Sequence, residues 1–205
     1  MSIPDAWGLK YEEVVSLTWL AYKGQGTPGR WNFPSAGSTW SLTNVIERGS
    51  FRAVVVKGKK TVLSFSGTDD LADWSDNIGQ GLTGVSWQYA YALYVARTYA
   101  ANMVVGHSLG GGLASYVAIY GGKQCATVNP APLNINLASS IAMLRNSNLV
   151  INYVAPGEAL DILDAAMLNM RRVGRIYNVP SKGGWNPVDR HLLDNLTGFT
   201  PPVKV

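Results

Sequence analysis

Apolar runs of strand length alternate with helical patterns along the second half of the chain. The apolar runs are residues 101–105, 125–128, 149–154 and 175–179, and the stretches with helical spacing are residues 85–99, 109–120, 135–145 and 159–170. This alternation predicts an α/β fold with a mostly parallel central sheet and helices on both faces. Right-handed crossovers between parallel strands leave functional residues in the loops that follow the strands.

The first half of the chain shows a different pattern. Residues 12–22 have the spacing of an amphipathic helix, and residues 24–37 contain prolines and glycines that predict an irregular loop. Two β-branched runs, residues 52–56 and 61–66, are separated by Lys57-Gly58-Lys59-Lys60. This spacing predicts a hairpin.

The composition fits one domain, residues 1–205, with few charges. The chain has a net charge of +4, and 15% of its residues are charged, against about 25% in an average soluble protein. It contains no block of Lys and Arg, which argues against a nucleic-acid partner, while the positive balance favours contact with the acidic headgroups of a membrane surface. The single cysteine, Cys125, allows no intramolecular disulfide and no metal site built from several cysteines.

The first residues of the chain do not have the pattern of an export signal. Residues 1–10 include Pro4, Asp5 and Trp7, where a secretory signal needs a basic segment followed by an apolar one. Apolar runs also stay shorter than the roughly 18 residues that a membrane-spanning helix requires. We therefore expect a soluble protein that is cytoplasmic or is exported by a non-classical route.

Residues 106–110, Gly-His-Ser-Leu-Gly, form a G-x-S-x-G motif between an apolar strand and a helical stretch. In this context the motif is typical of a nucleophile elbow, a sharp turn that exposes the serine at the amino end of the following helix. The helix dipole at that position favours a developing oxyanion. A glycine-rich helix start with an incidental serine is the alternative, but it does not account for the flanking strand. We expect Ser108 to be the nucleophile.

A serine nucleophile needs a general base, and the chain has two histidines. His107 lies inside the elbow, where the turn that exposes Ser108 points the neighbouring side chain elsewhere, so we expect a structural role for it. His191 lies within residues 187–193, where the start of a final helix can carry it over the sheet toward Ser108. By elimination, His191 is the predicted base.

The acid of the triad should lie between the serine and the histidine along the chain. Two carboxylates follow the predicted strand at residues 149–154. Glu158 comes after a Pro156-Gly157 turn that aims it back at the histidine, whereas Asp161 is expected one turn into the next helix. Either carboxylate could also serve only to complement the dipole of that helix. Both residues are therefore candidates.

An oxyanion donor is expected from the loop after an early strand. Thr68 follows the predicted strand at residues 61–66, and its backbone N–H together with that of Leu109 would form the oxyanion hole. A series of acidic residues comes next, and these are Asp69, Asp70, Asp73 and Asp76. Their spacing is not that of a calcium-binding loop, and helix capping by the first two explains them better, so no metal is expected.

Together these motifs resemble the lipase class 3 family of α/β-hydrolases. The resemblance spans residues 50–195 and rests on Ser-Gly-Thr at 66–68, Asp73-Trp74, residues 106–111, Val-Asn-Pro-Ala-Pro at 128–132, Asn-Tyr-Val at 152–154, Gly157-Glu158 and His191. It implies an α/β-hydrolase fold and a minimal, bacterial or phage-like serine esterase acting on acylglycerols or phospholipids. By position it favours Glu158 over Asp161 as the acid, although the family usually has an aspartate there. The interval between Thr68 and Ser108 is short for the family and leaves little chain for a cap or lid.

The predicted activity is hydrolysis of a lipid ester through an acyl-enzyme, with no cofactor. The alternatives are acyltransfer or thioester hydrolysis with the same triad, and a non-catalytic hydrolase fold used for binding, for which a broken triad would be expected. Several aromatic residues either belong to the core or line an acyl groove or contact a lipid surface. They are Trp74, Trp87, Tyr89, Tyr91 and Tyr94.

Overall fold

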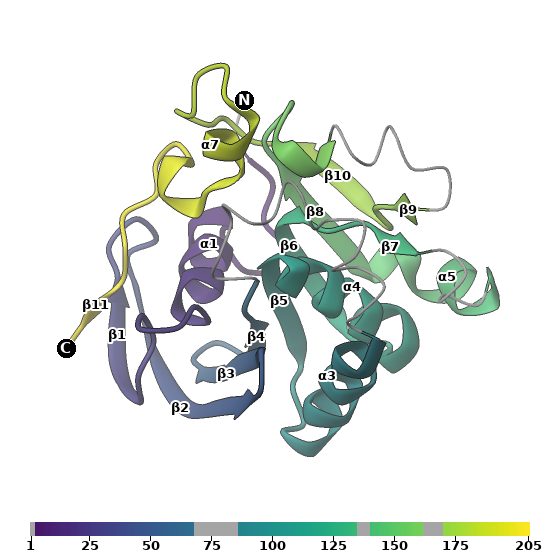
Figure 1. Ribbon diagram of the computed structural model, residues 1–205. Helices are drawn as coiled ribbons and strands as arrows, with labels where there is room; N and C mark the ends of the chain where they lie inside the picture. The colour runs from purple at the N-terminus through teal and green to yellow at the C-terminus, as the bar shows by residue number, and fades with distance from the viewer. Residues whose placement is uncertain (1–2, 68–85, 135–139, 162–169) are drawn as a thin grey trace.

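One large sheet forms the centre of the protein. The computed structural model describes residues 3–67, 86–134, 140–161 and 170–205. Within these ranges the sheet has nine strands, which are β1 (Gly29–Phe33), β2 (Ser38–Arg48), β3 (Phe51–Lys57), β4 (Thr61–Phe65), β5 (Met103–Ser108), β6 (Gln124–Pro130), β8 (Val150–Val154), β10 (Arg175–Asn178) and β11 (Val203–Lys204). Their order is β10-β8-β6-β5-β4-β3-β2-β1-β11 (Figure 1). A separate pair joins β7 (Leu133–Asn134) to β9 (Met170–Arg171).

The sheet has a parallel half and an antiparallel half. From β4 to β10 neighbouring strands are parallel, whereas from β4 to β11 they are antiparallel. The expectation of a mostly parallel sheet is therefore wrong for half of the strand pairs. The cause lies in short connections, because β2, β3 and β4 follow one another through turns that have no room for a crossover helix. The predicted hairpin of β3 and β4 is confirmed.

Strands β1 and β2 are elements that the sequence patterns did not reveal. β1 lies inside residues 24–37, which we expected to be irregular. Pro28 and Pro34 flank this strand rather than interrupt it, so its pairing with β2 is intact. In β2 the buried Trp40 and Leu42 alternate with more exposed neighbours, which is the pattern of a strand with one buried face.

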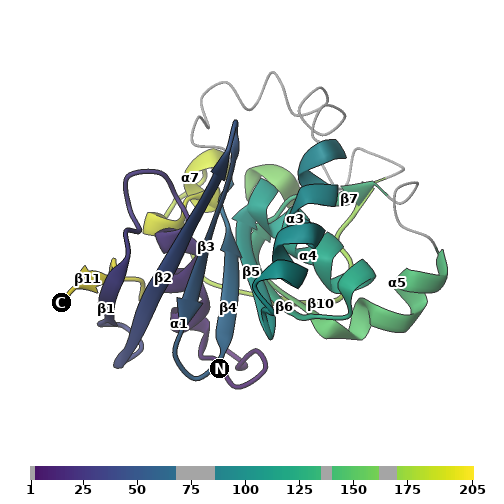
Figure 2. The same ribbon diagram turned by 90° about the horizontal axis from the view of Figure 1, so that it is seen from below.

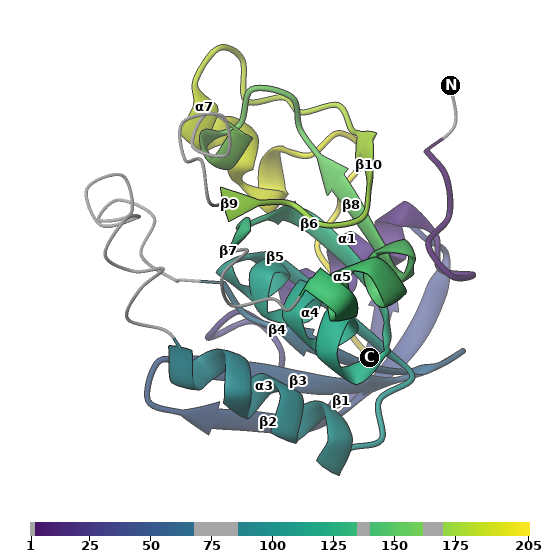
Figure 3. The same ribbon diagram turned by 90° about the vertical axis from the view of Figure 1, so that its right-hand side faces the viewer.

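Helices cover both faces of the sheet, as predicted. They are α1 (Tyr11–Leu20), α3 (Ser86–Thr98), α4 (Leu109–Gly121), α5 (Ser140–Asn146) and α7 (Pro187–His191), with 3-10 turns η1 (Ser147–Leu149) and η2 (Leu193–Asn195). The sheet curves around α1 on one face (Figure 1), and α3, α4 and α5 lie against the other (Figure 3). None of the described helices is both long and apolar enough to cross a membrane.

Two of the predicted helices lie only partly within the described residues. The helix expected at residues 135–145 is described only from Ser140, because residues 135–139 lie outside the described ranges. The helix expected at residues 159–170 is helical at residues 159–161, and residues 162–169 are again outside these ranges. Met170 belongs to β9 and pairs with Asn134, so the end of that prediction is wrong. The pairing partner lies far away along the chain, and local apolar spacing does not reveal it.

Two apolar clusters, one on each face, hold the helices to the sheet. On the α1 face, Leu17 and Trp40 are buried in a cluster with Val105 of β5. On the opposite face, Leu113 of α4 belongs to a cluster with Phe65 of β4. Because β5 is buried on both faces, apolar residues follow one another along it, and this makes the strand recognisable in the sequence.

The parallel half places the ends of several strands at one edge of the sheet. Since β4, β5, β6 and β8 are parallel, their last residues, Phe65, Ser108, Pro130 and Val154, lie along the same edge. The turn from β2 to β3 also lies there, because β3 begins where its antiparallel neighbour β4 ends. Figure 2 shows α7 on the same side of the molecule. This edge carries the candidate site.

Candidate active site

The G-x-S-x-G motif forms a sharp turn between β5 and α4. Ser108 is the last residue of β5, and its backbone has φ 57° and ψ −129°, a region that non-glycine residues rarely occupy. The strand and helix expected around the motif are both present. Ser108 is buried, and its Oγ has no hydrogen-bond partner among the described residues. The turn therefore holds a hydroxyl that the rest of the described structure does not use.

Glycines at the turn allow the backbone of three segments to come together. A Cβ atom at Gly106 would lie 2.1 Å from the carbonyl oxygen of Gly110. A Cβ atom at Gly110 would lie 2.3 Å from the carbonyl oxygen of Phe65, the last residue of β4. Both contacts are with backbone atoms, which cannot rotate away. The small residues of the motif thus fix the distance between α4, β5 and β4.

His191 and Glu158 are brought together by two different elements. His191 is the last residue of α7, and Glu158 follows β8 after the turn at Pro156-Gly157. Nδ1 of His191 lies 2.5 Å from Oε2 of Glu158, and both side chains are fully buried. The backbone N–H of Leu160 donates a second hydrogen bond to the same carboxylate oxygen, at 3.0 Å. Glu158 thus has the position expected of a carboxylate that orients an imidazole.

Asp161, the other candidate acid, directs its carboxylate toward a different set of partners. Its Oδ2 accepts a hydrogen bond from the backbone N–H of Gly157 at 3.0 Å, and its Oδ1 pairs with Nη1 of Arg172 at 2.9 Å. Its side chain is 42% exposed, whereas that of Glu158 is fully buried. The two candidate carboxylates therefore have different partners, and Glu158, which the resemblance favoured, is the one that contacts the imidazole.

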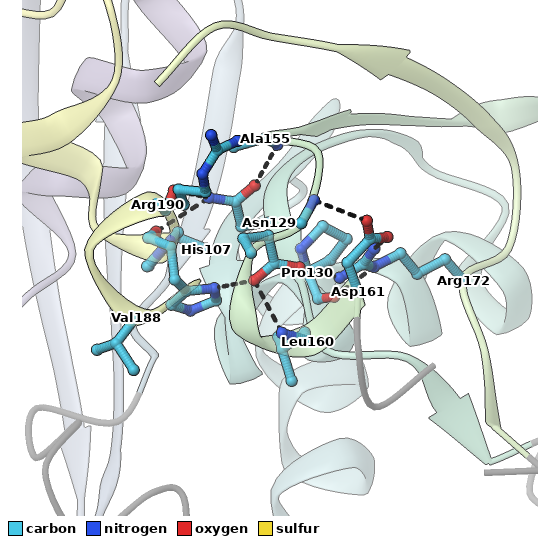
Figure 4. Close-up of polar contacts among 12 residues, drawn as sticks. His107, Asn129, Pro130, Ala155, Leu160, Asp161, Arg172, Val188 and Arg190 are labelled. Atoms are coloured by element: carbon cyan, nitrogen blue, oxygen red, sulfur yellow. Dashed lines mark hydrogen bonds and ion pairs between the residues drawn. The ribbon is translucent and has the colours of Figure 1, made fainter. Parts of the chain in front are cut away.

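Arg172 is a residue of the site that sequence reasoning missed. Its side chain is buried, and Nη2 pairs with Oε1 of Glu158 while Nη1 pairs with Asp161. Its Nε donates a hydrogen bond at 3.0 Å to the carbonyl oxygen of Pro130, at the end of β6 (Figure 4). Arg172 follows the short strand β9, and no motif surrounds it. Only the fold brings it beside Glu158.

His107 packs against His191, and both of its ring nitrogens form hydrogen bonds within the protein. Its Nε2 donates to the backbone carbonyl of His191 at 2.8 Å, and its Nδ1 accepts from the hydroxyl of Tyr22 at 2.5 Å. The two imidazole rings are 4.6 Å apart. Burial, and next the proximity of His191, hold the pKa of His107 well below its ordinary value of 6.5. His107 is therefore neutral at physiological pH.

Asn129, in β6, is hydrogen-bonded to the last residue of α7 and to the residue that follows β8. Its Nδ2 donates to the carbonyl oxygen of His191 at 3.0 Å, and its Oδ1 accepts from the backbone N–H of Ala155 at 2.8 Å (Figure 4). Its own backbone has a φ of 42°, in the left-handed region. Asn129 belongs to the Val-Asn-Pro-Ala-Pro stretch at residues 128–132, whose residue types alone predict no chemical role. The stretch is part of the family resemblance, but its sequence does not indicate which groups Asn129 would bind.

The expected oxyanion hole is only partly within the described residues. Leu109 is the first residue of α4, so its backbone N–H is at the free amino end of that helix. Thr68 lies outside the described ranges, as do Trp74 and the acidic residues between 69 and 76. A Cβ atom at Gly67 would lie 3.0 Å from Cβ of Ser108, so the chain leaving β4 does approach the elbow. Among the described residues, no group of three or more His, Cys, Asp or Glu could hold a metal ion.

Comparisons with known proteins point to one class. A family model described as a Tle-like phospholipase domain matches residues 38–186, which is more than half of the chain. The extracellular phospholipase A1 of Serratia liquefaciens is 38% identical over 78 residues. That match covers 36% of this chain and 24% of the relative, so the similarity spans about a quarter of the relative's length.

Proposed function

The chain belongs to the Tle-like phospholipase family, and we propose that it hydrolyses an acyl ester of a phospholipid through a serine-bound acyl-enzyme. The name of the Serratia liquefaciens relative, a phospholipase A1, supports a phospholipid substrate. The observation that carries the proposal is the buried pair of His191 and Glu158 at the sheet edge where the Ser108 elbow ends. A buried histidine–carboxylate pair is not explained by contact with solvent, whereas a serine nucleophile needs a histidine that a carboxylate orients.

In the proposed reaction, each residue of the site has a chemical role that is determined by the donor and acceptor atoms of its side chain or backbone. Oγ of Ser108 attacks the ester carbonyl while Nε2 of His191 accepts its proton and then delivers it to the departing lysophospholipid oxygen. Glu158 accepts from Nδ1–H of His191, so Nε2 is the ring nitrogen that exchanges the proton with the serine and the leaving group. The backbone N–H groups of Leu109 and Thr68 would stabilise the tetrahedral oxyanion. Water then attacks the acyl-enzyme by the same route and releases the fatty acid.

We assign the acid to Glu158 and give Asp161 a supporting position. Glu158 contacts the imidazole with one oxygen and Arg172 with the other, so both of its oxygens are fixed. Asp161 contacts the far side of the same guanidinium. Arg172 is therefore a positioning residue: it holds the carboxylate that in turn holds the imidazole.

The imidazole of His191 is also fixed through its backbone. Its carbonyl oxygen accepts hydrogen bonds from Nε2 of His107 and from Nδ2 of Asn129. Both donors come from strands of the parallel half, β5 and β6, and so they tie the end of α7 to the sheet. This gives His107 the structural role that the elbow geometry suggested, and it leaves His191 as the base.

We further propose an α/β-hydrolase fold related to the class 3 lipases. The order along the chain supports this, because the elbow serine comes first, the carboxylate follows a later parallel strand, and the histidine lies on a terminal helix. The antiparallel strands at one side of the sheet and the parallel strands at the other are compatible with that fold.

The test is to compare the wild type with Ser108→Ala by labelling with a fluorophosphonate and by activity on phospholipids, acylglycerols and a thioester. We expect labelling of the wild type only, and loss of nearly all phospholipid hydrolysis in the variant. Ser115→Ala removes another buried serine hydroxyl from α4 and serves as the matched control. Equal labelling of Ser108→Ala would refute the elbow assignment. A higher rate on the thioester, or acyl transfer to an added alcohol, would move the protein to another acyl-transfer class.

A further inference from the structure

One face of α3 exposes aromatic side chains next to an arginine. Trp87, Tyr91 and Tyr94 follow one another at helical spacing, and Arg48 at the end of β2 lies against them. These residues line a groove of about 610 Å³, which we call the α3 patch. Trp87 is 40% exposed and Tyr94 is 62% exposed. Large aromatic side chains at such exposure are uncommon on a surface that contacts only water.

The α3 patch carries positive charge. The guanidinium of Arg48 lies 5.0 Å from the ring centre of Tyr91 and 5.9 Å from that of Trp87, so the cation is held over the aromatic surface. The sequence of α3 contains no acidic residue, and Arg97 follows Tyr94 by three positions on the exposed side. Glu47 is the next residue to Arg48 in β2, but it pairs with Arg52. Because side chains alternate along a strand, Glu47 and Arg48 belong to opposite faces of the sheet.

The α3 patch lies at the same edge of the sheet as the Ser108 elbow. Arg48 is paired with Phe51 across the turn from β2 to β3, and the N–H of Ser66, just after β4, donates to the carbonyl of Arg52. This turn is therefore beside the carboxyl end of β4, which approaches the elbow. Figure 2 and Figure 3 both show α3 beginning on the side of the molecule where α7 lies. The end of the patch formed by Arg48 and Trp87 therefore lies at the sheet edge that carries the candidate site.

We propose that the α3 patch docks the protein on the headgroup layer of an anionic phospholipid bilayer. Tryptophan and tyrosine have an apolar body and a polar tip, which suits the boundary between headgroups and acyl chains. An arginine beside them pairs with lipid phosphate and with anionic headgroups. This docking surface is separate from the proposed catalytic site. The docking role rests on the proposed phospholipase function only because the substrate is taken to be a component of the bilayer.

A second exposed apolar pair allows a matched control. Ile141 and Leu144 of α5 are 70% and 82% exposed, more than the aromatic residues of the patch. They are aliphatic, and they lie on a different helix. If the exposure of apolar side chains alone determined bilayer binding, α5 would bind as well as α3. The proposal instead requires the combination of aromatic rings and a cation.

The experiment measures binding to vesicles by co-sedimentation, with Ser108→Ala as the background so that no lipid is consumed. The vesicles consist of phosphatidylcholine alone or of phosphatidylcholine with phosphatidylglycerol. The patch variants are Trp87→Ala/Tyr94→Ala and Arg48→Gln, and the control is Ile141→Ala/Leu144→Ala. Circular dichroism verifies that each variant is folded. Rates on vesicles and on a water-soluble ester are then compared in proteins that keep Ser108.

We expect the aromatic double variant to lose about tenfold in partitioning to both kinds of vesicle, because two apolar contacts are removed. Arg48→Gln should lose about fivefold on the anionic vesicles and little on phosphatidylcholine alone. Raising the salt concentration should reduce the difference between Arg48→Gln and its parent. The α5 control should bind like its parent. In active protein, the aromatic double variant should slow hydrolysis of vesicles far more than hydrolysis of the soluble ester.

Several results would overturn the docking role. One is a parent protein that does not bind vesicles, and another is loss of binding in the α5 control with binding retained in the patch variants. An equal loss of activity on the soluble ester would make the α3 patch an acyl-chain subsite. Dimerisation of the parent protein that is abolished in the aromatic double variant would assign the patch to a second copy of the chain.

A different result would separate the two proposals. If the protein that keeps Ser108 binds vesicles but hydrolyses no ester, the proposed function is refuted and the docking role is retained.

Discussion

The Ser108 elbow and the acid corner, formed by Glu158, Asp161, Arg172 and His191, are built in different ways. At the elbow, glycine backbones approach one another so closely that a single added carbon would overlap with a carbonyl oxygen. At the acid corner, the contacts are between charged and polar side chains, and all but Asp161 are almost completely buried. The elbow thus depends on the absence of side chains, and the acid corner depends on matching charges.

This difference teaches which kind of substitution should damage each region. A methyl group is enough to disturb the elbow, whereas a change of charge without a change of size should leave it intact. At the acid corner the reverse holds, because an isosteric amide keeps the shape of a carboxylate and removes its charge.

The first prediction compares the two carboxylates of the acid corner. Glu158→Gln should reduce kcat by up to about 10⁴-fold, because an amide no longer holds His191 in the tautomer that leaves Nε2 free of a proton. Asp161→Asn should cost far less, since that carboxylate contacts Gly157 and Arg172 rather than the reacting groups. Steady-state kinetics on a phospholipid, with circular dichroism for folding, measures both.

A larger loss in Asp161→Asn than in Glu158→Gln would reverse this assignment and make Asp161 the acid. KM gives a second criterion. An orienting carboxylate should change kcat with little change in KM, because substrate binding does not involve it. A matching rise in KM would indicate that the acid corner shapes the substrate site instead.

The second prediction concerns the guanidinium that joins the two carboxylates. Arg172→Met should lower the free energy of unfolding by about 3 kcal/mol, since Glu158 is left buried with one oxygen unpaired. It should also reduce kcat, by about 10²-fold, because the carboxylate that orients the imidazole loses its anchor. Urea denaturation and kinetics measure the two effects.

Arg172→Lys separates the charge from the geometry. A lysine keeps a cation for Glu158 but loses the fork that also reaches Asp161 and the carbonyl of Pro130. It should recover most of the stability and part of kcat. If Arg172→Met is as active as the wild type at a temperature where it is folded, Arg172 has no positioning role.

The third prediction returns to the elbow. Gly110→Ala should lower the free energy of unfolding by about 1–3 kcal/mol, because its new carbon would lie 2.3 Å from the carbonyl oxygen of Phe65. Activity should fall as well, since α4 moves relative to Ser108. Gly112→Ala is the control on the same helix: its nearest neighbour would be the hydroxyl of Tyr89, at 3.2 Å. Alanine favours a helix over glycine by about 1 kcal/mol, so Gly112→Ala should be close to neutral. Equal losses in both variants would contradict the close-approach argument.

The same contrast explains which parts of the molecule could be predicted from the sequence. The elbow is a local pattern: Gly106 to Gly110 are contiguous, and their flanking strand and helix are visible as apolar spacing. The hairpin of β3 and β4 is likewise local, and both were predicted. The roles of Ser108, His191 and Glu158 remain predictions for the experiments above.

The parts that were missed depend on contacts between distant segments. Arg172 reaches Glu158 only because β9 and β8 lie where the fold puts them, and no spacing rule links the two residues. β1 was missed because Pro28 and Pro34 suggested a loop, whereas pairing with β2 stabilises the strand between them. Pairing along an edge is a property of the whole sheet, so a window of a few residues does not contain it.

The last prediction concerns the histidine that joins the two regions, and its effect is the smallest. Burial lowers the pKa of His107 well below 6.5, so the folded protein does not take up a proton there at pH values where the unfolded chain does. Stability from this residue is therefore complete above pH 6.5 and is lost as the pH falls below it. Between about pH 6.5 and about pH 5.5, the free energy of unfolding should fall by about 1 kcal/mol more in the wild type than in His107→Gln. Glutamine keeps a donor for the carbonyl of His191 and does not titrate. Urea denaturation of both proteins at the two pH values provides the comparison, and identical pH dependence would show that His107 is not held neutral by its burial.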